Sequence, residues 1–242
     1  MNFTDISIPG NKVFPFVKRQ LLLLISLFFL ALGVALCVRS DLGSSVISSA
    51  PYAFFLAGKK GLVPDWTLGM YTNLLNILLV MGQILVLRRR YRPWQLLQLL
   101  IGVVFGALID ASMALTSFLE TVGRLEIRLL IMLVGSTLMA LGVSMEMRCA
   151  SITMPGEGLP AALAKVTGKP FADMKILTDV LLVTVAIASS FLFFGEWMWN
   201  VVGVGTLFAM LYIGMAVKII SRHLGWFDRL LETNRSIIDP IQ

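Results

Sequence analysis

Long apolar stretches alternate with short polar connections along most of the chain, and their lengths predict helices that cross a membrane. A helix needs about 20 residues, rising about 1.5 Å each, to span the hydrocarbon core of a bilayer. Six stretches have this length or nearly so: Leu21–Val38, Trp66–Leu87, Pro93–Leu119, Leu129–Met145, Ile176–Gly195 and Trp197–Val217. We therefore expect an all-α polytopic membrane protein with six transmembrane helices.

Two further apolar segments, Ser44–Gly58 and Thr153–Gly168, have only about 15 residues each and are too short to cross. Both begin with residues that favour a helix start, with Ser44 and Ser45 as the cap candidates in the first segment and Thr153 in the second. Both close with glycine and lysine, which favour a helix end. We expect two short helices, either re-entrant or lying at the membrane interface.

The sequence from Ala31 to Lys60 returns 109 residues later, from Ala140 to Lys169, with eight of 30 positions identical. The identities include a glycine, an arginine, a proline and a lysine, which two similarly apolar helices would not share by composition alone. Each copy holds three predicted spans, an odd number, so the second copy starts on the opposite side of the membrane and the halves form inverted repeats. The predicted divisions are a cytoplasmic N-terminal segment, two repeats and a cytoplasmic tail, at residues 1–20, 21–122, 123–220 and 221–242.

Composition and charge agree with this arrangement. Of 242 residues, 57% are hydrophobic and 14% are charged, with a mean hydropathy of +0.86, which is typical of an integral membrane protein. With the N-terminus in the cytoplasm, inner connections carry 15 Lys and Arg residues and outer ones carry five, as the positive-inside rule requires. The net charge is +6, and the Lys and Arg residues flank the predicted spans. We therefore expect these residues to contact the lipid bilayer and not nucleic acid.

Ionisable residues in or beside membrane spans are costly, so each is a candidate for binding a substrate. Asp110 lies well inside the third predicted span, and Asp179 lies near the start of the fifth. Arg39 and Arg148 hold equivalent positions in the two repeats, just ahead of a short helix whose N-terminus attracts anions. Glu157 lies early in the second short helix, as either a cap residue or a proton or cation site.

The two arginines also have a purely structural explanation, because both are close enough to the membrane surface to reach it. In that case Arg39 pairs with Asp41 and Arg148 pairs with Glu146, and both serve as anchors.

Uncharged polar residues form a second set of candidates for lining a substrate path: Ser44, Ser45, Asn73, Asn76 and Thr153. Asn73 and Asn76 are three residues apart and share one helix face. Hydrogen bonding between helices explains such residues equally well. The chain has a single histidine, in the tail, and no HExxH, GxSxG or Cys/His metal motif, so we expect no enzyme activity, no cofactor and no metal site.

Three motifs, ALGVALCVRSDLGSS after the first span, FGALID in the third and GVGTLFAMLYIG in the last, resemble the bacterial YczE/YyaS/YitT family of small membrane proteins. The resemblance covers roughly Lys18 to Ser221. Members often have a proline after the first double serine, where this chain has Val46. The resemblance implies a six-span fold in the bacterial cytoplasmic (inner) membrane, and it implies no particular substrate.

Inverted repeats interrupted by short helices are typical of secondary transporters. We therefore expect a small-molecule transporter or exporter that works by alternating access, with arginines that favour an anionic substrate. The alternative is a non-transporting membrane accessory or scaffold protein. The sequence leaves open whether the chain forms a homo-oligomer.

The predicted topology can be tested by labelling single introduced cysteines with a thiol reagent that does not cross membranes. Lys59→Cys should react in intact cells, because position 59 is predicted to lie outside. Lys169→Cys should react only after the cells are permeabilised. Labelling of both positions from the same side would contradict the inverted arrangement.

Overall fold

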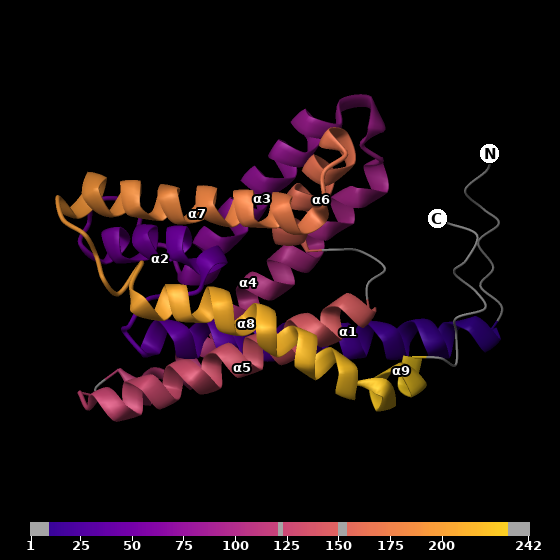
Figure 1. Ribbon diagram of the computed structural model, residues 1–242, viewed down its shortest axis with the longest axis horizontal. Helices are drawn as coiled ribbons and strands as arrows, with labels where there is room; N and C mark the ends of the chain where they lie inside the picture. The colour runs from indigo at the N-terminus through magenta and orange to yellow at the C-terminus, as the bar shows by residue number, and fades with distance from the viewer. Residues whose placement is uncertain (1–9, 121–122, 150–153, 232–242) are drawn as a thin grey trace.

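The computed structural model describes residues 10–120, 123–149 and 154–231, and these ranges are built from helices and their connections (Figure 1). The helices are α1 (Gly10–Arg39), α2 (Val46–Lys59), α3 (Leu68–Leu87), α4 (Leu97–Leu115), α5 (Leu125–Cys149), α6 (Pro155–Thr167), α7 (Phe171–Phe194), α8 (Val204–His223) and α9 (Gly225–Leu231), with 3-10 turns at Arg88–Arg90, Pro93–Leu96 and Ser117–Leu119.

Six of these helices, α1, α3, α4, α5, α7 and α8, are long and apolar enough to cross a membrane. The predicted all-α polytopic membrane fold is confirmed. The last span is displaced from its predicted position, because α8 begins at Val204 and not at Trp197. Before α8 the backbone forms a turn in which the N–H groups of Val201 and Val202 donate to the Met198 carbonyl. The Thr206 hydroxyl accepts a hydrogen bond from the Gly203 N–H. This turn is as apolar as a helix, so hydropathy could not distinguish it from one.

Both predicted short helices are present, as α2 and α6, but the serines ahead of α2 do not cap it. Ser45 is the N-cap residue, yet its hydroxyl pairs with the Ser48 hydroxyl at 2.7 Å. The backbone N–H and the hydroxyl of Ser44 both donate to the Val201 carbonyl, at 3.1 and 2.8 Å. Ser44 therefore joins the α2 start to the turn before α8, a partner that local sequence does not reveal. Thr153 lies outside the described residues.

α1 and α5 pack along each other through glycines. A Cβ at Gly33 would lie 2.5 Å from the Met139 side chain, and one at Gly142 would lie 2.7 Å from the Leu30 backbone nitrogen. Along α1 from Leu30 to Gly33 the partner on α5 moves backwards from Gly142 to Met139, so the helices are antiparallel. Met139 and Gly142 stand 109 residues after Leu30 and Gly33, so the two contacts are the same contact made once by each repeat.

Other helix contacts also occur in pairs related by exchanging the halves of the chain. α1 packs on α4 as α5 packs on α8, and α2 packs on α7 as α6 packs on α3 (Figure 1). The starts of the two short helices meet, because the Ile47 side chain packs on Gly156, its equivalent in the second repeat. One pair is unequal, since α3 packs along α4 while α7 and α8 make few contacts.

Substitution of one glycine can test how far the fold depends on the α1–α5 contact. Gly142→Ala should lower the free energy of unfolding by about 1–3 kcal/mol, because the added methyl would overlap the α1 backbone. Gly214→Ala on α8 is the matched control, because a Cβ there meets nothing within 4 Å. Thermal unfolding of the purified protein in detergent should show a lower midpoint for Gly142→Ala alone, and equal midpoints would contradict the prediction.

Candidate functional site

A half-open cavity of about 530 Å³ lies where α1 ends, between α1, α2, α4 and α5. We call it the Arg39 cavity. Its lining residues are Val38, Arg39, Asp41, Tyr52, Phe55, Met113, Ala114, Ser117, Glu120 and Arg128. The charged part consists of two arginines and two carboxylates, and most of the remaining wall is apolar. Pockets of this size, apolar with a few convergent polar groups, are the usual sites for small molecules.

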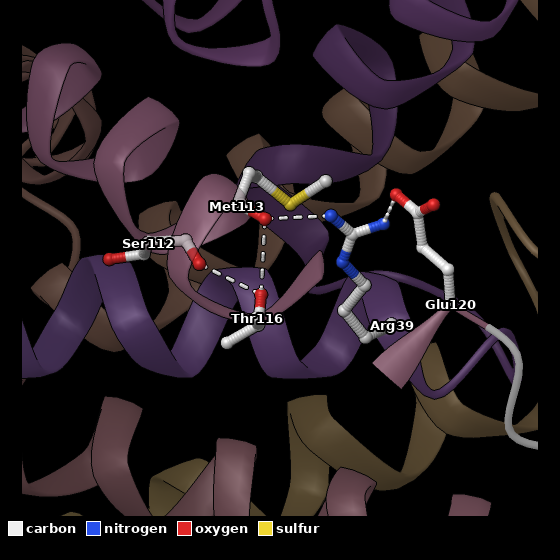
Figure 2. A network of polar contacts seen from close by, with 5 residues as sticks. All are labelled: Arg39, Ser112, Met113, Thr116 and Glu120. Atoms are coloured by element: carbon white, nitrogen blue, oxygen red, sulfur yellow. Dashed lines mark hydrogen bonds and ion pairs between the residues drawn. The ribbon is translucent and has the colours of Figure 1, made fainter. Parts of the chain in front are cut away.

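Arg39 is held at the wall of this cavity by the end of α4 (Figure 2). One guanidinium nitrogen donates to the Met113 carbonyl at 2.7 Å, another forms an ion pair with Glu120, and Nε is buried without a hydrogen-bond partner among the described residues. The Thr116 hydroxyl bonds the Ser112 carbonyl at 2.8 Å and so closes the same helix end. A cation at a helix C-terminus is favoured by the exposed carbonyls and the helix dipole.

The predicted pairing of Arg39 with Asp41 is wrong. Asp41 has a φ of 54°, in the left-handed region, and its carboxylate forms an ion pair with Arg128 at the start of α5 at 2.5 Å. The partner of Arg39 is Glu120, 81 residues away, directly after the 3-10 turn that follows α4. No local sequence pattern connects Arg39 to Glu120, because their proximity depends on the packing of α1 against α4.

Tyr52 and Phe55 of α2 supply an aromatic wall of the Arg39 cavity. Their ring centroids lie 6.2 Å apart and their planes differ by 19°, so the rings are stacked. Burial raises the pKa of Tyr52 to about 12, so its hydroxyl stays protonated and can donate a hydrogen bond. Neither residue stood out in the sequence, because aromatic residues in an apolar helix are ordinary core residues.

Arg148, the repeat equivalent of Arg39, is held in a similar way at the opposite end of the α1–α5 pair. It forms an ion pair with Asp228 of α9 and donates to the carbonyls of Ser221 and Leu224 near the end of α8. The predicted pairing with Glu146 is therefore also wrong. Here the arginine side chain lies beside α9 and is 23% exposed, and the side chains of Leu224 and Phe227 are buried.

A second arginine stands at each end of the α1–α5 pair. Arg128 at the start of α5 is the repeat equivalent of Arg19 in α1, at the same offset of 109 residues that relates Arg148 to Arg39. Arg19 donates to the Cys149 carbonyl where α5 ends. Each end of the pair thus carries two arginines, one from each helix.

Glu157 and Asp179, two of the predicted site residues, come together around a lysine that the sequence did not single out. The Lys175 ammonium lies 3.3 Å from Glu157 and 3.0 Å from Asp179. Glu146 of α5 is only 6% exposed. Its carboxyl group accepts a hydrogen bond from the Met154 backbone and is close enough to Glu157 for the two charges to repel. Two carboxyl groups therefore contact one lysine, and a third, that of Glu146, lies within electrostatic range, which is one positive charge against up to three negative charges.

The spacing of Lys175 and Asp179, four residues apart on a helix, was the one sequence signal for this cluster. Within the described ranges, no group of three or more His, Cys, Asp or Glu residues is arranged to hold a metal ion.

Asp110, Asn73 and Asn76 lie between α3 and α4 and are not part of the cavity wall. Asp110 accepts hydrogen bonds from the Gly69 backbone N–H and the Thr67 hydroxyl, both at 2.7 Å, and so stabilises the start of α3. Asn73 lies against Gly106 and Asn76 against Gly102, where a glycine leaves room for the amide. These residues pack two helices together, which is the structural role that interhelical polar residues commonly have.

The predicted site residues therefore do not form one site. Arg39 lies in the cavity, Glu157 and Asp179 in the lysine cluster, and Arg148 beside α9. Ser44 joins the α2 start to the turn before α8, and Ser45 bonds Ser48 within α2.

A protein-family model described as a family of unknown function (DUF6198) matches residues 17–222. Comparison with curated proteins and comparison with solved structures each find no match. The family match neither links the chain to the YczE/YyaS/YitT family nor conflicts with that resemblance.

Removing the ammonium from the lysine cluster should destabilise the protein. Lys175→Met leaves the carboxyl groups of Glu157 and Asp179 without their partner, and we expect a loss of about 1–3 kcal/mol in the free energy of unfolding. Lys165→Met, at an exposed position of α6, is the control and should leave stability nearly unchanged. Chemical denaturation in detergent measures both, and an equal effect of the two substitutions would contradict the prediction.

Proposed function

The chain belongs to the DUF6198 family of unknown function, and we propose that it is a membrane transporter for a small anionic molecule. The observation that carries this proposal is the Arg39 cavity, which is half-open and holds a nearly buried arginine between transmembrane helices. Charged side chains placed within a membrane protein mark substrate or ion pathways more often than they serve stability. The cavity volume of about 530 Å³ suits a small molecule better than a protein segment.

The proposed mechanism is alternating access between two inverted repeats. The antiparallel packing of α1 on α5 and the paired helix contacts support this arrangement, because an axis that exchanges the halves also exchanges the two membrane faces. The positive-inside bias supports an orientation with the Arg39 cavity outside and both chain ends in the cytoplasm. The resemblance to the YczE/YyaS/YitT family supports the bacterial cytoplasmic membrane as the location.

The two ends of the α1–α5 pair differ, which supports alternating access. At the Arg39 end a half-open cavity lies beside the arginine, whereas at the Arg148 end Asp228 of α9 pairs with the equivalent arginine and the side chains of Leu224 and Phe227 are buried. In the proposed cycle this is the outward-open state. The carboxyl groups around Lys175 can bind a proton or a cation during the cycle. Each proton or cation bound there changes the net charge of the cluster.

The proposal can be tested by uptake into proteoliposomes that contain the purified protein, using labelled small anions, amino acids and nucleobases. Arg39→Gln should reduce uptake by about tenfold or more, because a charge-assisted hydrogen bond to the substrate is worth about 1.5–3 kcal/mol. Arg124→Gln is the matched control, since Arg124 is largely exposed and is not part of the cavity wall.

Absence of uptake across the whole panel would contradict the transport proposal. An accessory or scaffold protein would instead retain its cellular role when both Arg39 and Arg148 are replaced by alanine, and would lose it through changes in the C-terminal tail.

A further inference from the structure

We infer that the Arg39 cavity recognises the carboxylate of a small monoanion with an apolar body, and that Glu120 is a tethered competitor that occupies the carboxylate position on Arg39. The inference deepens the proposed function and rests on it. It identifies the chemical group that is bound and assigns Glu120 a regulatory part in binding.

The two partners of the Arg39–Glu120 ion pair are held very differently (Figure 2). The Arg39 side chain is 11% exposed and remains fixed to the Met113 carbonyl at the end of α4. The Glu120 side chain is 60% exposed, follows the last 3-10 turn and pairs with Arg39 alone among the described residues. An ion pair to an exposed carboxylate is weak. Glu120 can therefore swing into solvent while Arg39 keeps its place.

The geometry of Arg39 favours a carboxylate as the group that replaces Glu120. The guanidinium nitrogen that pairs with Glu120 makes a charge-assisted hydrogen bond of the kind that a carboxylate accepts best. The second terminal nitrogen is engaged by the Met113 carbonyl and Nε is buried, so this one nitrogen is left for a ligand. A substrate carboxylate can accept the same bond that the Glu120 carboxylate accepts now.

The charge of the cavity favours a single negative charge on the ligand. The wall holds Arg39 and Arg128 against Asp41 and Glu120, which balance. When Glu120 turns out to solvent, the remaining three groups carry one net positive charge. A monoanion restores the balance, whereas a dianion exceeds it and a neutral molecule leaves it unmet.

The remaining wall accounts for the apolar body. The stacked rings of Tyr52 and Phe55 face the space together with Val38 and Ala114. Such a surface gains from covering an apolar or aromatic group.

The second half of the chain repeats the arrangement. Arg148 is engaged by Asp228, which lies 80 residues further along the chain, just as Glu120 lies 81 residues beyond Arg39. In both halves the acidic residue follows the last span and the arginine ends the first. Because the pairing occurs in both halves, we take an internal carboxylate on each arginine to be a regular feature of the fold.

The inference is tested by measuring the Kd of phenylacetate and of phenylacetamide, which shares the ring and lacks the charge, by calorimetry on the detergent-solubilised full-length protein. If Glu120 occupies Arg39 about 90% of the time, Glu120→Gln should lower the Kd for phenylacetate roughly tenfold. The amide should bind no more tightly than before. Glu126→Gln is the matched control, because it removes the same charge from a 77% exposed side chain outside the cavity, and it should leave the Kd at the wild-type value.

An unchanged or raised Kd for phenylacetate in Glu120→Gln would overturn the inference, as would equal tightening for the amide or the absence of phenylacetate binding to both proteins. Uptake into proteoliposomes separates this failure from failure of the proposed function. Binding that depends on Glu120 without any flux would refute transport alone. Flux of a substrate that is indifferent to Glu120→Gln would refute the competitor alone.

Discussion

Two antiparallel helices can approach to backbone contact only where no side chain stands between them, and α1 and α5 meet this condition at Gly33, Gly135 and Gly142. Two other spans pack directly on this pair, α4 on α1 and α8 on α5. The ends of the pair also carry the arginines. A small change in the spacing of α1 and α5 therefore moves the Arg39 cavity and the Arg148 site together.

The hydrophobic pattern was sufficient to predict the spans, because a helix that crosses a bilayer must be apolar over a nearly fixed length. The error at the last span has a physical cause. The residues between Trp197 and Gly203 are mostly apolar and yet form a turn. The Leu42 carbonyl accepts a hydrogen bond from the Gly205 N–H, and the Val201 carbonyl accepts hydrogen bonds from the N–H and the hydroxyl of Ser44. Such tertiary hydrogen bonds determine where the helix starts and leave no mark on hydropathy.

Charged partners could not be predicted in the same way. Sequence proximity suggested Asp41 for Arg39 and Glu146 for Arg148, whereas the true partners lie 81 and 80 residues away. Lys175 escaped notice because a lysine near a predicted helix end is ordinary, and only packing places it between Glu157 and Asp179. The repeat does not supply the partners either, since the offset of 109 takes Glu120 to Arg229 and not to Asp228.

The packing of Ile47 on Gly156 has a consequence for the middle of the molecule. Two helix starts face each other there, and their partial positive charges repel. The Ile47 side chain fills the space that a side chain at position 156 would need, and one residue comes from each half of the chain. Any sliding of one half past the other therefore breaks this contact, and the two helix starts separate with it.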